Sequence, residues 1–299
     1  MVSILPTGAK SLFLVCLVLI STSVRAQQVV KTDTEMNESA TLQQPTLEAK
    51  KHKSLLIVGG TVAGPNDNPF QVALLQKNED HSVYLCGGSL VAPNVVVTAA
   101  HCGFISMEKG PKQHVSPSEM TVLAGTRDLN SGGVPHDVMD IFVHPKYILD
   151  KPGYDVAVWK LKTRVEGIPF AQLATSDGII GSKLLVTGWG ATGHGNGKDN
   201  SHLLLKVSVP IVSHATCKAA AENPSQITSN VLCAGFSRGA RGHCYGDSGG
   251  PATRGPSNMI LAGIVGFILR DECTEPEAYS VYTRVSDPEI RDFIRKYLD

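Results

Sequence analysis

From residue 57 to the C-terminus, the hydrophobic positions form short runs rich in β-branched residues, separated by glycine, proline, asparagine and aspartate. Examples of these runs are Val95–Thr98, Lys183–Thr187 and Met259–Val265. Short runs of this kind, bounded by turn-forming residues, are typical of β-strands. A chain with many of them is predicted to be all-β, as a barrel or a sandwich.

Two stretches have a helical pattern instead. Near the C-terminus, Ser286–Glu289 supplies an N-cap and an early proline. The apolar residues that follow at helical spacing are Ile290, Phe293, Ile294, Tyr297 and Leu298. This spacing predicts a short amphipathic C-terminal helix, at about 287–298, that packs on the β-structure. Three consecutive alanines within His214–Glu222 predict a second short helix.

The N-terminal pattern differs from both. Lys10 precedes the apolar run 11–20, and Val24–Ala26 offers small residues for cleavage, so residues 1–26 are predicted to be a secretory signal peptide. A transmembrane anchor is the alternative, but a spanning helix needs about 20 apolar residues. No later segment is long and apolar enough to span a bilayer. We therefore expect a secreted, extracellular protein without a membrane partner.

Residues 27–56 are rich in Gln, Thr, Glu and Lys, and they contain no Cys, Trp or Phe. Such a segment can bury little apolar surface and is expected to be flexible. It holds the one clear N-glycosylation sequon of the chain, Asn37–Ser39. The basic stretch Lys50–Lys53 lies near its end.

Six cysteines remain after the predicted signal peptide. They are Cys86, Cys102, Cys217, Cys233, Cys244 and Cys273. An even number of cysteines in an exported chain predicts three disulfides and leaves their connectivity open. A metal site is not favoured, because the chain has no Cys-x-x-Cys pair and no His-x-x-x-His cluster.

The chain of 299 residues has 27 basic and 27 acidic residues. Proteins that bind nucleic acid carry an excess of Lys and Arg, so this balance argues against a nucleic-acid partner. The length allows one large β domain or two smaller ones.

Three motifs carry candidate chemistry. Gly246–Pro251 surrounds Ser248 with glycines, which permit a sharp turn, close approach of a substrate, and N–H groups aimed at a developing oxyanion. An ordinary surface turn is the alternative interpretation of this motif. Thr98–Cys102 places His101 at the end of an apolar run, where a lone histidine is more often structural.

Asp155 begins another apolar run, Tyr154–Trp159. A carboxylate buried there needs a hydrogen bond or a charged partner. Taken together, Ser248, His101 and Asp155 supply a nucleophile, a base and a residue that orients the base. Unrelated triads have different orders along the chain, and the order here is His, Asp, Ser.

On these residues the chain resembles the chymotrypsin-like serine endopeptidases, from residue 57 to the terminal helix. The motifs that carry the resemblance are Ile57-Val58-Gly59-Gly60, Cys86-Gly87-Gly88-Ser89-Leu90, Thr98-Ala99-Ala100-His101-Cys102, Asp155-Val156-Ala157, Thr187-Gly188-Trp189-Gly190 and Gly246-Asp247-Ser248-Gly249-Gly250-Pro251. The resemblance implies a protease domain over 57–299. Its fold would be two antiparallel six-stranded β-barrels, at about 57–165 and 166–285, with the active site in the cleft between them.

The resemblance also implies residue roles. Ser248 attacks the scissile carbonyl, His101 transfers the proton, and Asp155 orients His101. Backbone N–H groups of Gly246 and Ser248 form the oxyanion hole. The implied disulfides are Cys86–Cys102, Cys217–Cys233 and Cys244–Cys273.

Activation is implied as well. Residues 27–56 are an activation propeptide, and its removal frees the α-amino group of Ile57 to form a buried ion pair with Asp247. Relatives are usually cut after Arg or Lys, but Leu56 precedes Ile57 here. The activating protease is therefore either not trypsin-like, or it cuts after Lys53 and trimming follows.

The implied specificity pocket consists of Gly242, His243, Gly266, Phe267, Ile268 and Ser280. Gly242 stands where trypsin-like relatives have an aspartate, which argues against cleavage after Arg or Lys. Ile268 and Ser280 replace glycines and narrow the pocket, as in elastase-like relatives. Small or medium apolar residues are therefore expected before the cut. His243 could instead face the pocket and, when protonated, favour an acidic residue.

The expected function is thus that of a secreted serine endopeptidase made as a zymogen. Its partners would be protein or peptide substrates, an activating protease and protein protease inhibitors, and it would be a monomer. The alternative is a catalytically weak homologue that acts as a binding or inhibitory module. The unusual wall Gly266–Ile268 favours that alternative, since Gly266 lacks the hydroxyl that relatives place near the buried aspartate. A lipase would also fit Gly246–Gly250, but not the β-rich surroundings.

No cofactor is expected. Some relatives bind calcium in a loop between two acidic residues, and the corresponding segment Gly125–Leu129 lacks the usual glutamate.

Overall fold

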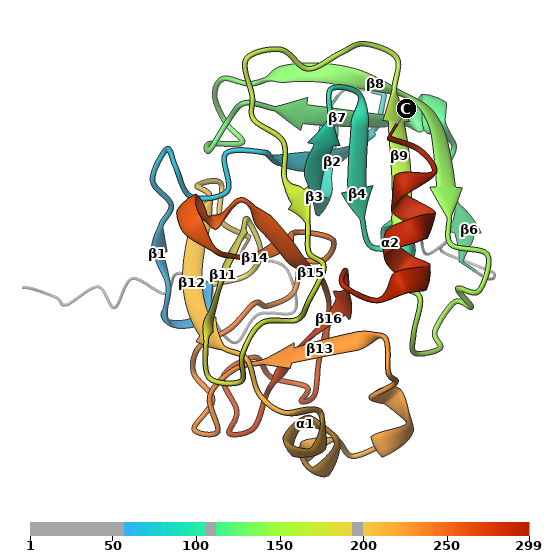
Figure 1. Cartoon of the computed structure of the whole chain (residues 1–299). Coiled ribbons are helices and arrows are strands. Elements are labelled where there is room, and N and C mark those ends of the chain that lie inside the picture. The colour runs from blue at the N-terminus through green and yellow to red at the C-terminus, as the bar shows by residue number, and fades with distance from the viewer. Residues whose placement is uncertain (1–56, 80, 106–111, 193–199, 299) are drawn as a thin grey trace, which may run out of the picture. The chain divides into compact units, whose positions relative to one another are not determined.

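The fold is that of a computed structural model of the chain, which describes residues 57–79, 81–105, 112–192 and 200–298 (Figure 1). The predicted signal peptide (1–26), the predicted propeptide (27–56) with its sequon, and Leu56 lie outside the described residues. No helix in the described ranges is long and apolar enough to cross a membrane.

The first half of the described chain folds into a closed barrel of six antiparallel strands, in the order β2-β3-β4-β9-β8-β7 (Figure 1). These strands are β2 (Gln71–Lys77), β3 (Ser82–Ala92), β4 (Val95–Thr98), β7 (Met120–Ala124), β8 (Val134–Val143) and β9 (Ala157–Leu161). All four residues of β4 are buried, which explains why it has three consecutive valines rather than an alternation of polar and apolar residues. The barrel core includes the fully buried Trp159.

The second half forms a sheet of eight strands in the path β1-β12-β11-β14-β15-β16-β13, with β10 paired to β15. Its strands are β1 (Thr61–Val62), β10 (Gln172–Leu173), β11 (Lys183–Gly188), β12 (Leu205–Pro210), β13 (Val231–Ala234), β14 (Pro251–Arg254), β15 (Ile260–Ile268) and β16 (Ser280–Arg284). A bridge between Ile211 and Ala234 joins the end of β12 to β13. This bridge closes six of the strands into a second barrel.

Two details differ from the sequence-based expectation. The segment after residue 57 does not enter the first barrel directly, because β1 pairs with β12 of the second. In addition, β10 runs parallel to β15, whereas the other paired strands are antiparallel. Two short strands, β5 (Phe104–Ile105) and β6 (Gln113–His114), form a separate hairpin.

The helices are short, as the sequence predicts. They are α1 (His214–Ala220), α2 (Pro288–Arg295) and the 3₁₀ turns η1 (Ile57–Gly59), η2 (Ala100–Gly103), η3 (Pro117–Glu119), η4 (Pro224–Gln226) and η5 (Pro256–Asn258). The Asp287 side chain caps α2 by accepting from the N–H groups of Glu289 and Ile290. Ile290 and Ile294 of this helix pack into the core of the first barrel, beside β9 (Figure 1).

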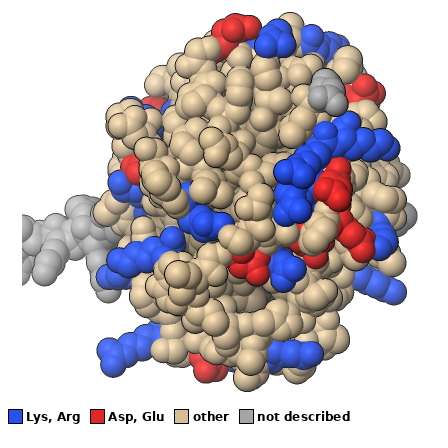
Figure 2. Space-filling view, in the orientation of Figure 1, with Lys and Arg blue, Asp and Glu red and all other residues tan. Residues whose placement is uncertain are grey.

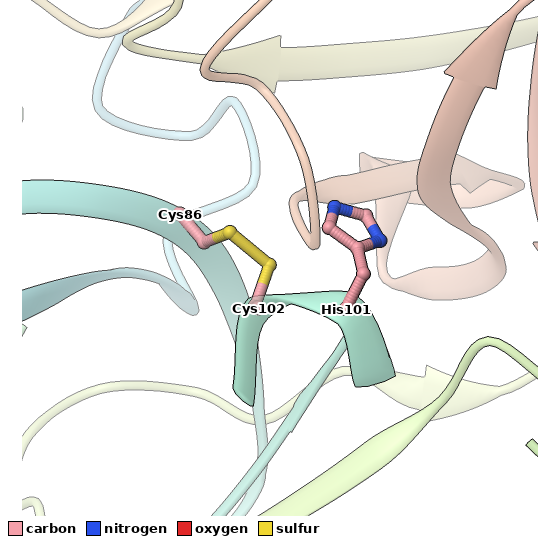
Figure 3. Close-up of side chains that lie close together, drawn as sticks. All are labelled: Cys86, His101 and Cys102. Carbon is pink, nitrogen blue, oxygen red and sulfur yellow. A yellow bond between two sulfur atoms is a disulfide. The ribbon is translucent and has the colours of Figure 1, made fainter. Parts of the chain in front are cut away.

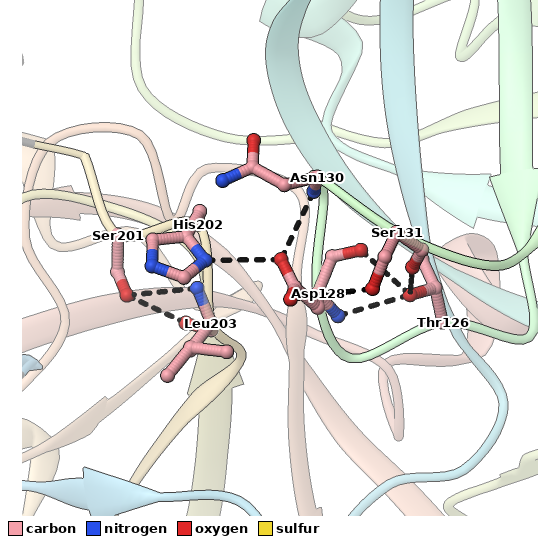
Figure 4. A network of polar contacts seen from close by, with 7 residues as sticks. All are labelled: Thr126, Asp128, Asn130, Ser131, Ser201, His202 and Leu203. Atoms are coloured by element: carbon pink, nitrogen blue, oxygen red, sulfur yellow. Dashed lines mark hydrogen bonds and ion pairs between the residues drawn. The ribbon is translucent and has the colours of Figure 1, made fainter.

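A polar network links loops of the two barrels (Figure 4). Asp128 contacts His202 Nδ1 at 2.9 Å and accepts from the Asn130 N–H at 3.0 Å. The Leu129 N–H donates to the His202 carbonyl at 2.8 Å, and Asp128 bridges to Leu203. These contacts fix the position of one barrel relative to the other. Asp128 belongs to the segment considered above for calcium, and its carboxylate is engaged in this network.

Candidate active site

His101 is held from two sides. It lies in η2, directly after β4, and the neighbouring Cys102 forms a disulfide with Cys86 of β3. The Asp155 carboxylate contacts His101 Nδ1 at 2.8 Å, and its other oxygen accepts from the His101 backbone N–H at 2.9 Å. This double contact fixes the ring and leaves Nε2 as the nitrogen that can exchange a proton.

Asp155 is itself positioned by an unusual backbone. Gly153 and Tyr154 before it both have positive φ angles, of 92° and 53°. The Thr283 hydroxyl on β16 donates to the Asp155 carbonyl at 2.7 Å. A residue of the second barrel therefore anchors the backbone of Asp155, which belongs to the first.

The electrostatics of the site favour the protonated form of His101. Burial lowers the pKa of His101, but the charge of Asp155 and its hydrogen bond raise it more, and Lys112 lowers it slightly. The net result is a pKa above the ordinary value of 6.5. A histidine whose charged form is stabilised by a carboxylate suits general acid–base catalysis.

The turn that carries Ser248 lies against the segment that carries His101. The Gly87 N–H donates to the Ser248 carbonyl at 2.8 Å. Gly249 has φ +74°, and a Cβ there would lie 2.1 Å from Thr98 Oγ1 and 3.2 Å from the Ala99 nitrogen. Only glycine permits this approach, which places the serine turn next to the residues that precede His101. In the described part of the chain, no hydrogen bond joins the Ser248 hydroxyl to His101.

Two backbone N–H groups around Ser248 are free. Gly246 has φ +89°, and its carbonyl accepts from the Tyr84 hydroxyl at 2.8 Å. Among the described residues, neither the Gly246 N–H nor the Ser248 N–H donates to a protein acceptor. Unpaired N–H groups beside a nucleophile are what a developing oxyanion requires.

The three disulfides join the pairs that the resemblance implies, Cys86–Cys102, Cys217–Cys233 and Cys244–Cys273. The Cys86–Cys102 disulfide adjoins His101, and the Cys244–Cys273 disulfide adjoins the turn that carries Ser248. Figure 3 shows the His101 ring beside the Cys86–Cys102 disulfide. Within the described ranges, these three residues are the one group of potential metal ligands found close together. Both sulfurs are in a disulfide, so neither is a thiolate that could bind a metal.

Asp247 is fully buried. Its two carboxylate oxygens accept from the Gly190 N–H and the Cys244 N–H, each at 2.8 Å. Burial raises the pKa of this carboxyl to about 7, although the two hydrogen bonds lower it. No basic side chain in the described part of the chain pairs with it.

Ile57 is also fully buried, in the core of the second barrel. The carbonyl of the following residue, Val58, accepts from the Gly242 N–H at 3.3 Å. In the uncut chain the Ile57 nitrogen belongs to a peptide bond, so it carries no charge. The structure thus buries both members of the expected ion pair but does not join them.

Several of the candidate specificity residues lie close together. A Cβ on Gly242 would lie 2.9 Å from the Ser280 hydroxyl, and Ser280 pairs across the sheet with Ile268. His243 is 3% exposed, and its ring packs on Tyr282 with the ring centres 5.4 Å apart. Burial lowers the pKa of His243 to about 3, despite an opposing hydrogen bond with the Phe267 backbone. His243 is therefore neutral in this position.

An open cavity of about 380 Å³ adjoins His101 and Asp155. Gly266 and Phe267 form part of its wall. Lys112 and Asp150, an ion pair at 2.7 Å, also line it. No sequence motif marks Lys112, Asp150, Tyr84 or Thr283, because each acts through a contact with a residue distant in sequence.

The chain matches the family model described as Trypsin over residues 57–294. It is 36% identical to a trypsin of Saccharopolyspora erythraea over 233 residues, which are 77% of this chain and 93% of the relative. It is 35% identical to a vitellin-degrading protease of Bombyx mori over 236 residues, 77% of this chain and 81% of that protein. Identity to the clotting factor G beta subunit of Tachypleus tridentatus is 31% over 246 residues, covering 77% of this chain and 76% of the relative.

Proposed function

This chain belongs to the trypsin family and is a serine endopeptidase, and from that premise we propose that it is secreted as an inactive precursor and cuts after small or medium apolar residues. His101, Asp155 and Ser248 are the proposed catalytic residues. The observation that carries this assignment is the double contact of Asp155 with His101, next to a serine turn that only glycines allow so close.

The proposed reaction begins with proton transfer. Neutral His101 takes the hydroxyl proton of Ser248 through Nε2 as the oxygen attacks the scissile carbonyl. Asp155 keeps the other ring nitrogen protonated and stabilises the imidazolium that forms. The N–H groups of Gly246 and Ser248 then donate to the oxyanion of the tetrahedral intermediate. His101 protonates the leaving amine, and water releases the acyl group by the same steps.

The proposed preference before the cut rests on the side chain of Ser280, which narrows the specificity pocket. Ser280 is buried, and a Cβ on Gly242 would lie 2.9 Å from its hydroxyl, so the serine occupies space beside Gly242 that a glycine would leave open. Neither residue offers a negative charge to Arg or Lys. The neutral state of His243 argues against the alternative preference for acidic residues. The pocket is therefore proposed to accept small apolar side chains of the substrate.

Cleavage of a peptide library by the chain cut to begin at Ile57 tests this proposal. We expect cuts after Ala, Val or Leu that disappear in the Ser248→Ala variant. Ser280→Gly should raise kcat/KM for Phe or Tyr relative to Ala by roughly tenfold or more, because pocket volume sets this discrimination. The matched control is Ser237→Gly on an exposed loop. Cuts chiefly after Arg, Lys, Asp or Glu would overturn the specificity assignment.

The pH profile offers a second test. Activity requires neutral His101, so it should fall as pH drops through a pKa above 6.5. Replacing Asp155 by Asn removes the negative charge that raises this pKa and leaves burial and Lys112, which lower it. The acid limb of kcat/KM should therefore move to lower pH in Asp155→Asn, together with a large loss of turnover.

Lys112→Gln should move the same limb in the opposite direction, to higher pH, since the Lys112 charge lowers the pKa of His101. Lys218→Gln, at an exposed site on α1, is the control and should leave the profile unchanged. Equal profiles in all three variants would show that another group controls the acid limb.

Gly266 suggests a variant with higher activity. A Cβ at this position would lie 3.9 Å from an oxygen of Asp155, so the hydroxyl of a serine could reach the carboxylate. We expect Gly266→Ser to raise kcat/KM by about fivefold, which corresponds to the free energy of one added hydrogen bond. Gly266→Ala adds the Cβ without the hydroxyl and is the matched control. If both variants change activity equally, the hydroxyl has no role.

A further inference from the structure

A second cavity, of about 390 Å³, lies on the surface next to the start of the protease domain. Gly59 and Gly60 line it on one side, and residues of β11 and β12 line it on another. It shares no lining residue with the cavity beside His101. Its volume falls within the range of about 300–1,000 Å³ that is usual for small-ligand sites.

The charge of this cavity is positive. Lys183, Lys206 and Arg241 line it, and Asp67 is the one carboxylate among its lining residues. Lys206 pairs with Asp67 at 2.6 Å, and that carboxylate also accepts from the Gly64 N–H. Within the described residues, neither Lys183 nor Arg241 has a carboxylate partner. Figure 2 shows basic side chains on the side of the molecule where Figure 1 labels β1, β11 and β12.

The Arg241 side chain packs on an aromatic ring at the edge of the cavity. Its guanidinium lies 5.7 Å from the centre of the Phe236 ring, and Phe236 also lines the cavity. The planar fork of an arginine binds sulfate or phosphate through two parallel hydrogen bonds, and a lysine adds charge. Two cations without carboxylate partners that line one cavity suit an anion with more than one such group.

The cavity also touches the loop that leads to the proposed nucleophile. A Cβ on Gly59 would lie 2.6 Å from Arg241 Cγ, so these two residues are in direct contact. The next residue, Gly242, donates to the Val58 carbonyl at 3.3 Å. Ser248 follows six residues later on the same loop. An anion bound between Arg241 and the lysines of β11 and β12 would therefore hold the 57–60 segment against this loop.

We propose that this cavity binds a small anion with two or more sulfate or phosphate groups, and that binding stabilises the contact between residues 57–60 and the loop of Arg241. Binding of this anion is separate from peptide cleavage, so it can be measured on a chain without proteolytic activity. The full chain with Ser248→Ala is suitable, since it removes the nucleophile and leaves the cavity unchanged.

Isothermal titration calorimetry with sucrose octasulfate and with inositol hexakisphosphate tests the binding. We expect one ion per chain for at least one compound, with affinity falling as NaCl is raised from roughly 0.05 to 0.5 M. If both compounds bind, the site recognises negative charge in general. If only one binds, the site distinguishes sulfate from phosphate groups. The double variant Lys183→Glu/Arg241→Glu should bind roughly tenfold or more weakly.

The matched control is Arg164→Glu/Lys218→Glu, which makes the same charge change at exposed positions outside the cavity. Equal weakening in both double variants, or no saturable binding of either compound, overturns the site. Circular dichroism checks that each variant is folded.

Hydrogen exchange tests the coupling between the cavity and the 57–60 segment, because bound anion should slow exchange of the amides in residues 57–60 and 240–244. Binding without that slowing overturns the coupling. A chain that binds the anion but cleaves no peptide would contradict only the proposed function.

Discussion

Replacing Ser248 by alanine is expected to reduce the turnover of a peptide substrate by roughly 10⁶-fold, with little change in stability. The hydroxyl supplies the attacking oxygen, and no other nucleophile in the turn can replace it. Ser248 makes no side-chain hydrogen bond in the described structure, so its removal leaves no polar partner unsatisfied. Turnover is measured with the best substrate from the peptide library, and unfolding in urea measures stability.

The control for this variant is Ser237→Ala, on an exposed loop, which should keep full activity. A Ser248→Ala protein that retains turnover within tenfold of the parent would exclude covalent catalysis by Ser248. His101→Ala should lose activity to a similar extent, and the double variant should be no worse than either single variant. The two residues act as one unit, and their effects are therefore far from additive.

The second large effect concerns activation. We expect the uncut chain to be nearly inactive and cleavage between Leu56 and Ile57 to raise activity by roughly 10²–10³-fold. The charged amine of Ile57 can then pair with Asp247, and an unpaired buried carboxylate costs several kcal/mol relative to a paired one. Asp247→Asn should abolish this gain. N-terminal sequencing of the active form should begin at Ile57, and any other start would contradict the activation account.

Asp247 also gives the uncut chain a pH-dependent stability. Its pKa of about 7 in the folded chain lies above the ordinary value of 3.8, so the folded state binds a proton that the unfolded state releases. The contribution of this group to stability is therefore greatest below pH 4 and is lost as pH rises towards 7. Urea unfolding of uncut Ser248→Ala should show this fall, and the added Asp247→Asn change should reduce it. An unchanged slope would mean that Asp247 is not the group responsible.

Local sequence features predicted much of this molecule. The runs that became β4, β11 and β15 were recognisable because turn residues bound them, and α2 because Asp287 and Pro288 begin it. The glycines around Ser248 marked a turn that only small residues allow. These features depend on steric limits of the backbone and on short-range periodicity, which a sequence shows directly.

Contacts between distant segments were not predictable in the same way. Nothing near Thr283 indicates that its hydroxyl anchors Asp155, and the sequence around Lys112 does not show that its charge reaches His101. The pairing of β1 with β12 joins segments that are distant in sequence, which no local pattern shows. The state of His243 required its burial, since the same residue in water has a pKa near 6.5 and would be partly charged.

The central claim is that Ser248 becomes a reactive nucleophile once the chain begins at Ile57. Labelling with a serine-directed fluorophosphonate tests it most directly, with mass spectrometry to locate the modified residue. In the cut chain we expect one label per molecule, on Ser248, and none in Ser248→Ala, while the uncut chain should react far more slowly. A folded, disulfide-intact cut chain that remains unlabelled would contradict the claim and favour a secreted binding module instead.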